Sequence, residues 1–179
     1  GVDERPLPMV DDELNYLCGN GFGTVKFVDR SFNHDPARAL RIWEMILAKG
    51  GETIFQFELH PLLLTEELFA FIATVPAGRF RFEVGLQSLS PEVLTACHRS
   101  PDSRRALEHI RRLCAMRNVV VHADLIAGLP FETRESFGRA ISALTLADPA
   151  ELQLGFLKLL SGTPLAARGH TGDMAVRAL

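Results

Sequence analysis

Short apolar runs alternate with longer amphipathic stretches along most of the chain. Five of the runs are rich in β-branched and aromatic residues, which predicts strands; they span residues 24–28, 53–58, 79–84, 119–123 and 152–157. Between them, apolar residues recur at spacings of three and four, which predicts helices. Strands and helices therefore alternate at the repeat of roughly 30 residues that is typical of βαβ units.

Capping residues place the starts of several predicted helices. Four starts are marked by a side chain that can accept a backbone N–H, with proline next in two cases: Asp35-Pro36, Thr65, Ser90-Pro91 and Thr133. Residues 11–18 predict a helix that no strand precedes. The glycine-rich turn at residues 19–23 follows this helix and opens a strand, the reverse of a dinucleotide-binding loop, so it is interpreted as a helix C-cap.

This alternation predicts an α/β fold with a parallel sheet, either open and doubly wound or part of a β/α barrel. Periodicity alone does not choose between the two. The chain has 179 residues, 47% of them hydrophobic and 23% charged, which suits one globular domain. The formal net charge of −3 gives no electrostatic reason to expect a nucleic-acid partner.

No apolar run approaches the roughly 20 residues of a membrane span, and no signal peptide is recognisable at the start. The first residue is Gly1 rather than methionine, so the chain is expected to be a fragment. The three cysteines are odd in number and far apart, which argues against a disulfide scaffold and favours a reducing, cytoplasmic compartment. Cys114 falls on the apolar side of a predicted helix and is expected to be buried.

Polar residues stand at the carboxyl end of every predicted strand, where parallel α/β folds place their ligands. They are Asp29 with Arg30 and Asn33, Glu58 with His60, Gln87 with Ser88, Asp124, and Lys158. We expect a shared ligand pocket there. The alternative is that Asp29 and Ser88 only cap loops or helices and that Glu58 faces solvent. Asp124 fits this alternative least, because it is the lone acid of an apolar strand.

The polar set suits a sugar-bearing, zwitterionic ligand. Carboxylates and an amide can bind ribose hydroxyls, and an acid can hold an ammonium group. Arg99 offers a planar fork to a carboxylate, and the glycine of Gly128-Leu129-Pro130 lets the backbone approach a flat ring. The six histidines are scattered, and His60 is the one most expected to take part in a site.

Four motifs resemble the core barrel of radical S-adenosylmethionine enzymes, from its second to its sixth strand. They lie at residues 25–33, 83–88, 124–130 and 157–165. They are similar to motifs of cobalamin-binding members and, for the second and third motifs, of oxygen-independent coproporphyrinogen oxidases. Arg30 stands where cobalamin-binding members often have a second acid.

The resemblance implies a partial (β/α) TIM-like barrel of about five parallel strands over residues 1–165, followed by a polar tail at 166–179. It also implies S-adenosylmethionine, a [4Fe–4S] cluster and, in the cobalamin-binding type, cobalamin as cofactors. Arg99 is expected to meet the methionine carboxylate, Gln87 and Asp124 the ribose, and Glu58 the ribose or the amino group. Asp29 is expected near the amino group, and Ser88 and Gly128 complete the expected cofactor-binding set.

One departure from the family is serious. The family holds its cluster on a CxxxCxxC loop after the first strand, and Cys18, Cys97 and Cys114 have neither that spacing nor that position. We therefore expect a truncated enzyme whose cluster ligands lie outside the chain, with no catalytic or metal-binding residue within it. The intact enzyme is expected to generate a 5′-deoxyadenosyl radical, with an electron donor and an unidentified, small-molecule or other, substrate as partners.

Two alternatives stay open. The first is a coproporphyrinogen-oxidase-like radical S-adenosylmethionine enzyme without cobalamin. The second is a barrel-derived module that binds a nucleoside and performs no chemistry.

Overall fold

The structure is a computed structural model that describes residues 4–160 and residue 165. The predicted tail at 166–179 lies outside the described residues. The helices are α1 (Leu7–Gly19), α2 (Pro36–Ala48), α3 (Glu66–Ile72), α4 (Pro91–Ala96), α5 (Ser103–Ala115) and α6 (Arg134–Thr145). The strands are β1 (Thr24–Lys26), β2 (Ile54–Leu59), β3 (Phe80–Gln87), β4 (Val120–Ala127) and β5 (Glu151–Phe156). Two short 3₁₀ turns, η1 (Phe32–His34) and η2 (Pro61–Leu63), follow β1 and β2.

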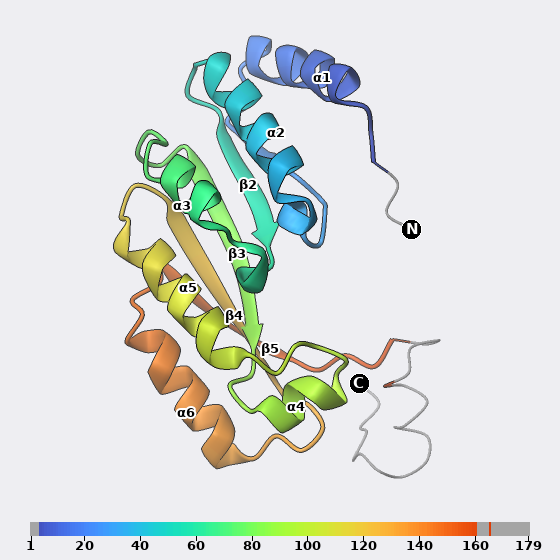
Figure 1. Ribbon diagram of the computed structural model, residues 1–179, viewed down its shortest axis with the longest axis vertical. Helices are drawn as coiled ribbons and strands as arrows, with labels where there is room; N and C mark the ends of the chain where they lie inside the picture. Colours follow the sequence, from blue (N-terminus) through green and yellow to red (C-terminus); the bar gives the residue numbers. More distant parts are fainter. Residues whose placement is uncertain (1–3, 161–164, 166–179) are drawn as a thin grey trace.

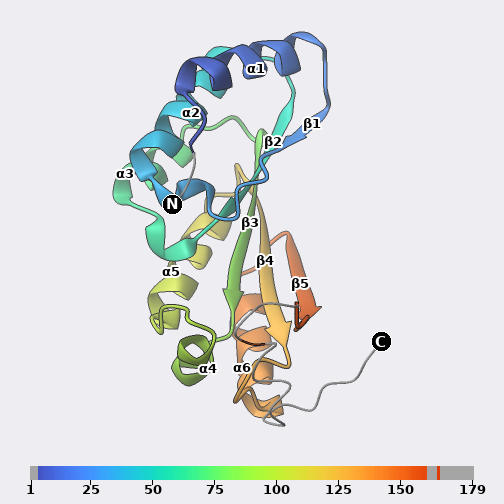
Figure 2. The same ribbon diagram turned by 90° about the vertical axis from the view of Figure 1, so that its right-hand side faces the viewer.

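The sheet has five parallel strands in the order β1-β2-β3-β4-β5, so each strand pairs with its neighbours in sequence. Right-handed crossovers that always step in one direction place every intervening helix on the same face of a sheet. Figures 1 and 2 show the helices along one side of the strands. This order excludes the doubly wound alternative and confirms the partial β/α barrel, which is an open crescent.

Three of the four predicted helix starts show the expected capping bond, whereas Ser90 precedes α4 without a side-chain capping hydrogen bond. Asp35, Thr65 and Thr133 each accept a hydrogen bond from the backbone N–H three residues later, at 3.1, 3.3 and 3.0 Å. Helix α1 begins earlier than predicted, at Leu7, because Pro8 fits the first turn of a helix. Helix α1 ends at Gly19, and Asn20 is its C-cap residue. The next residue, Gly21, has a φ of +69°, so the glycine-rich turn is a helix cap as expected.

The hydrophobic core lies between the helices and the outer face of the sheet. Side chains alternate along β2 and β3, so that one set is buried and the other faces away from the helices. Trp43 of α2 packs among the rings of Phe57, Phe80 and Phe82, with centroid distances of 5.7–5.9 Å. This aromatic cluster anchors α2 to the sheet and leaves the opposite face free for polar residues.

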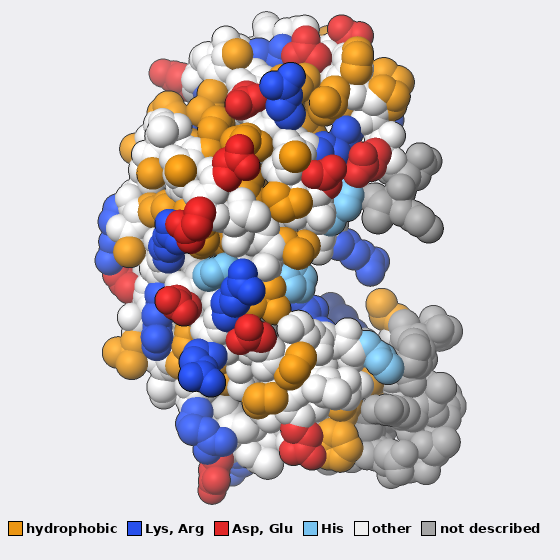
Figure 3. Space-filling view, in the orientation of Figure 1, with side chains coloured by type: hydrophobic (Ala, Val, Ile, Leu, Met, Phe, Trp, Pro, Cys, Tyr) orange, Lys and Arg blue, Asp and Glu red, His pale blue; other side chains and the backbone are white. Residues whose placement is uncertain are grey.

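The two outer strands of the crescent, β1 and β5, each pair on one side only within the described residues. Strand β1 is shorter than predicted, although Phe27 still donates its N–H to Gln56 O at 2.9 Å. None of the helices in the described part of the chain is long and apolar enough to cross a membrane. On the face seen in Figure 3, basic and acidic side chains are interspersed rather than gathered by sign.

Candidate functional site

The face of the sheet that points away from the helices, here called the inner face, is polar. Pairing aligns its residues in rows: Lys26, Gln56 and Arg81 in the first, Glu58, Glu83 and His122 in the second, Gly85 and Asp124 in the third. From the first row to the third, these positions come closer to the carboxyl ends of the strands. A half-buried surface with this many ionisable groups is suited to a polar ligand rather than to further packing.

Lys26, in the first row, forms ion pairs with two acids of the second row. Its Nζ lies 2.9 Å from a Glu83 carboxylate oxygen and 3.4 Å from one of Glu58, and the Gln56 amide also donates to Glu83. The hydrogen bond from Lys26 to Glu83 raises the pKa of the lysine. One cation therefore serves two carboxylates, and the inner face keeps an excess of negative charge.

Asp124 feels this excess directly. Burial first, and then the negative charges of Glu83, Glu58 and Glu151, raise the pKa of its carboxyl to about 6. No hydrogen bond to the Asp124 carboxylate is present within the described residues. A carboxyl with a raised pKa and no donor is poised to accept a hydrogen bond from a ligand.

Gln87 stands at the end of β3, and its carboxamide lies over Gly85, the residue that pairs with Asp124. The Oε1 atom of Gln87 is buried and has no hydrogen-bond partner in the described structure. A buried acceptor without a donor is costly unless something fills its place. Glu58, Asp124 and Gln87 thus all lie on the inner face.

Arg99 follows α4 and lines a small cavity of about 20 Å³ that also contacts His60 and Gly85. The volume is about that of one water molecule. Burial lowers the pKa of Arg99, and no acid of the described residues forms an ion pair with it. Burial and the Arg99 charge together lower the pKa of His60. Gly85 therefore borders both this cavity and the Gln87 carboxamide.

The backbone of His60 is held by Asn33, a fully buried residue in the turn after β1. Asn33 donates from Nδ2 to His60 O at 3.0 Å, and His60 N donates to Asn33 Oδ1 at 2.8 Å. The His60 ring accepts the N–H of Leu62 at 3.3 Å through Nδ1. These contacts fix the carboxyl end of β2 beside Arg99.

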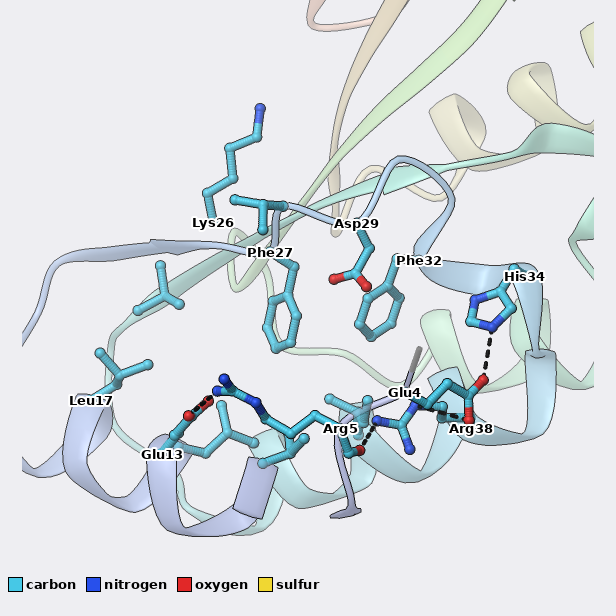
Figure 4. Close-up of a pocket in the computed structure, with 15 residues that line it drawn as sticks. Glu4, Arg5, Glu13, Leu17, Lys26, Phe27, Asp29, Phe32, His34 and Arg38 are labelled. Atoms are coloured by element: carbon cyan, nitrogen blue, oxygen red, sulfur yellow. Dashed lines mark hydrogen bonds and ion pairs between the residues drawn. The ribbon is translucent and has the colours of Figure 1, made fainter. Parts of the chain in front are cut away.

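Asp29 lies in a different place. It lines a cavity of about 390 Å³ between β1, α1 and α2, together with Phe27 and Phe32. In Figure 4, Phe27 and Phe32 point towards the helices while Lys26 points to the other side of β1. Asp29 therefore lines a second cavity, which Lys26 of the inner face also lines.

Ser88 and Gly128 have backbone roles. Ser88 is fully buried, and its hydroxyl accepts the N–H of Ser90 at 3.1 Å, so it shapes the turn after β3, as in the capping alternative. Gly128 follows β4 with a φ of +84°, and a Cβ there would lie 4.0 Å from Leu157. Glycine is favoured at this position by its conformation.

The cysteines do not form a cluster site. Cys18 is on α1, Cys97 ends α4, and Cys114 is buried in α5, where burial raises the pKa of its thiol to about 11. No group of three or more histidine, cysteine, aspartate or glutamate residues suited to a metal ion occurs in the described part of the chain. Cluster ligation needs thiolates, so these residues do not fit a [4Fe–4S] cluster.

The structure is a parallel β/α crescent whose polar inner face lies where such folds place their ligands. The sequence profile of the radical SAM superfamily matches residues 2–144. The chain belongs to this superfamily, whose enzymes use S-adenosylmethionine and a [4Fe–4S] cluster.

Curated relatives agree with this assignment. The tRNA-2-methylthio-N(6)-dimethylallyladenosine synthase of Bifidobacterium longum (strain DJO10A) is 30% identical over 173 residues, which cover 92% of this chain and 36% of the relative. The heme chaperone HemW of Mycobacterium tuberculosis (strain H37Rv) is 31% identical over 130 residues, which cover 73% of this chain and 32% of the relative. The chain spans about a third of the length of these relatives.

Solved structures share the fold. The radical S-adenosylmethionine methyltransferase TsrM from Kitasatospora setae, with cobalamin and a [4Fe–4S] cluster bound, superposes with a TM-score of 0.76 at 20% identity. That match covers 88% of this chain and 30% of TsrM. Coproporphyrinogen III oxidase (HemN) from Escherichia coli gives a TM-score of 0.65 at 16% identity, covering 94% of this chain and 39% of HemN.

Sequence reasoning missed Lys26, Gln56 and Glu83 as members of the inner face. A signal existed, because the alternation in residues 79–84 already assigns Glu83 to the face opposite Phe82. Sequence reasoning named Asn33 only as a polar residue after the first strand, since a contact across 27 residues leaves no local pattern.

Proposed function

We propose that this chain forms the S-adenosylmethionine-binding part of a radical S-adenosylmethionine enzyme. The observation that carries the proposal is the meeting, on the inner face, of Asp124 and Glu58 with the buried Gln87 Oε1, which has no donor in the described structure. Arg99, without an acid partner among the described residues, lines a cavity that also contacts Gly85, the residue under the Gln87 carboxamide. A zwitterionic nucleoside supplies the groups that this set lacks.

Each residue has a role that follows from its chemistry. Arg99 binds the methionine carboxylate through its planar fork. Gln87 and Asp124 accept hydrogen bonds from the ribose hydroxyls, and Glu58 accepts one from the ribose or from the amino group. Asp29 has no assigned contact in this proposal, since it lines the other cavity. Ser88 and Gly128 shape the loops around the ligand.

When bound, a [4Fe–4S] cluster held by ligands outside the described residues would supply the electron that cleaves S-adenosylmethionine to methionine and a 5′-deoxyadenosyl radical. The cluster ligands are not among the described residues of this chain, so we propose that the polypeptide alone is inactive. Cobalamin and an electron donor belong to the proposal as further components, and TsrM is described with cobalamin bound. The curated relatives differ by name in what they act on, so the match does not define the substrate.

Arg99→Lys in the full-length protein tests the ligand assignment. The lysine keeps the charge and loses the bidentate geometry, so S-adenosylmethionine affinity should fall about ten- to a hundredfold for one lost charge-assisted hydrogen bond of roughly 1.5–3 kcal/mol. Asp124→Ala should also weaken binding. Arg104→Lys, an exposed position on α5, is the matched control and should bind as the wild type does. Unchanged affinity in both Arg99→Lys and Asp124→Ala contradicts the proposal.

Anaerobic reconstitution tests the absence of cluster ligands. We expect the 179-residue chain, treated with iron and sulfide, to bind no stoichiometric [4Fe–4S] cluster by absorbance and iron analysis. The full-length methylthiotransferase relative serves as the positive control. A stoichiometric cluster on this chain contradicts the expectation.

A further inference from the structure

The end of β3 contains a β-bulge. Gly85 pairs with Asp124 and Gln87 with the next residue of β4, Leu125, so Leu86 is an extra residue in the strand. Gln87 has a φ of +67°, in the left-handed region that non-glycine residues seldom adopt. Bulges redirect side chains at the rims of sheets. Here the bulge and the unusual φ together turn the Gln87 side chain back over the inner face.

The Gln87 side chain occupies the space that a side chain at position 85 would need. A Cβ built on Gly85 would fall onto Nε2 of Gln87 and within 3.2 Å of its Cδ. Outside the adjoining residues, the three atoms closest to this Cβ all belong to Gln87. The carboxamide of Gln87 therefore occupies the space above Gly85.

We propose that Gly85 is a positioning residue for ligand binding. Because Gly85 has no side chain, the Gln87 carboxamide can lie over it, in a position where the amide oxygen accepts a hydrogen bond from a ribose hydroxyl. The inference rests on the proposed function for the identity of the ligand. It adds that the glycine acts only through Gln87, and that the ligand group recognised there is a hydrogen-bond donor. The buried Oε1, which has no donor in the described structure, supports this second point.

The matching substitution is Gly85→Ala. Alanine is compatible with a strand, and the atoms it meets are the far end of a flexible side chain, so the fold should be kept while the amide is displaced. The alanine methyl should have little effect once Gln87 has been shortened, because no atom outside Gln87 and the adjoining residues lies closer than 3.8 Å, an ordinary van der Waals distance. This makes the two positions a double-mutant cycle.

The experiment measures S-adenosylhomocysteine affinity by calorimetry in four full-length proteins: wild type, Gly85→Ala, Gln87→Ala and the double variant. We expect Gln87→Ala and Gly85→Ala each to weaken binding about 3- to 10-fold, the cost of one neutral hydrogen bond. The double variant should bind no more weakly than Gln87→Ala. Analogues that lack one ribose hydroxyl should show a smaller loss in both single variants. Gly138→Ala, at a helical position with open space, is the control and should bind as the wild type does.

A second measurement separates this inference from the proposed function. The side-chain amide resonances of Gln87, assigned by their absence in Gln87→Ala, should shift in Gly85→Ala without any ligand. Unmoved resonances overturn the positioning role. An additional loss of affinity when Gly85→Ala is placed in the Gln87→Ala background also overturns it, because the methyl group then acts directly. If Gln87→Ala leaves affinity unchanged while the resonances shift, Gly85 positions the Gln87 carboxamide, but the proposed hydrogen bond from the ribose to Gln87 is wrong.

Discussion

At the scale of single residues, two side chains near the strand ends hold backbone conformations that glycine would adopt more easily. Gln87 has a φ of +67° and Phe131, in the loop after β4, one of +63°. Gln87 gains a defined position over Gly85 from this conformation. Phe131 is 66% exposed, so little burial offsets the strain of its backbone.

Phe131→Gly should therefore stabilise the protein. Glycine tolerates the left-handed region, and we expect the free energy of unfolding to rise by about 1 kcal/mol in urea denaturation. Phe131→Ala keeps the Cβ and its strain while removing the ring, and should give no such gain. Equal stability changes in the two variants would show that the ring, and not the backbone, determines the effect.

The raised pKa of Asp124 leads to a pH-dependent prediction. Between pH 3.8 and about 6 the folded protein binds the Asp124 proton more tightly than the unfolded chain does, so the free energy of unfolding falls as the pH rises through this interval. Asp124→Asn removes the charge and should be more stable than the wild type above pH 6. Because Asp124 is only partly buried, solvent reduces the gain to about 1 kcal/mol. Urea denaturation at pH 5 and 7.5 should show the difference growing with pH; a constant difference contradicts the prediction.

At the scale of elements, the turn after β1 determines how the carboxyl end of β2 is held. Asn33 forms two hydrogen bonds with the backbone of His60 and is completely buried. The same turn leads into α2, whose cap at Asp35 is two residues further on. The strand ends around Arg99 therefore depend on a side chain from a neighbouring βα unit.

Asn33→Ala should destabilise the protein by about 2–4 kcal/mol, because it leaves a buried N–H and a buried carbonyl of His60 without partners. Thermal or urea denaturation measures the loss. Asn15→Ala, at an exposed position on α1, should change stability by less than about 0.5 kcal/mol. A similar small loss in both variants would show that the Asn33 contacts contribute little.

At the scale of the whole molecule, the crescent leaves exposed apolar residues on its last strand. Leu154 and Phe156 of β5 are 48% and 81% exposed, at an edge that is unpaired within the described residues. Unprotected edges of this kind promote association. We expect the chain to self-associate as its concentration rises.

Phe156→Lys should reduce this association, since a charge at an edge strand opposes pairing with another chain. Sedimentation velocity at several concentrations measures it. Leu146→Lys removes a residue of similar exposure, 80%, from the end of α6, and should leave association unchanged. Equal effects of the two variants would indicate a general response to charge rather than an edge contact.

The strands, the helices and most of their caps could be predicted from the amino-acid sequence, because they depend on contacts between residues close in the chain. The alternation around Phe82 and the caps at Asp35 and Thr133 are examples. Glu58 and Gln87 lie at or next to the ends of β2 and β3, as predicted, whereas Asp124 lies inside β4, which continues to Ala127.

Features that depend on pairing between distant segments became visible only in the folded structure. The consecutive strand order chose the barrel crescent over the doubly wound sheet, and the register placed Gly85 beside Asp124. The bulge at Leu86 shows no periodicity of its own, yet it directs the Gln87 carboxamide. Asp29 matched the pattern of the other strand-end residues, but it lies beyond the end of β1 and lines the cavity between β1, α1 and α2. Local spacing indicates where a strand lies, whereas the point at which it ends and the face to which a side chain points there are determined by its partners across the sheet.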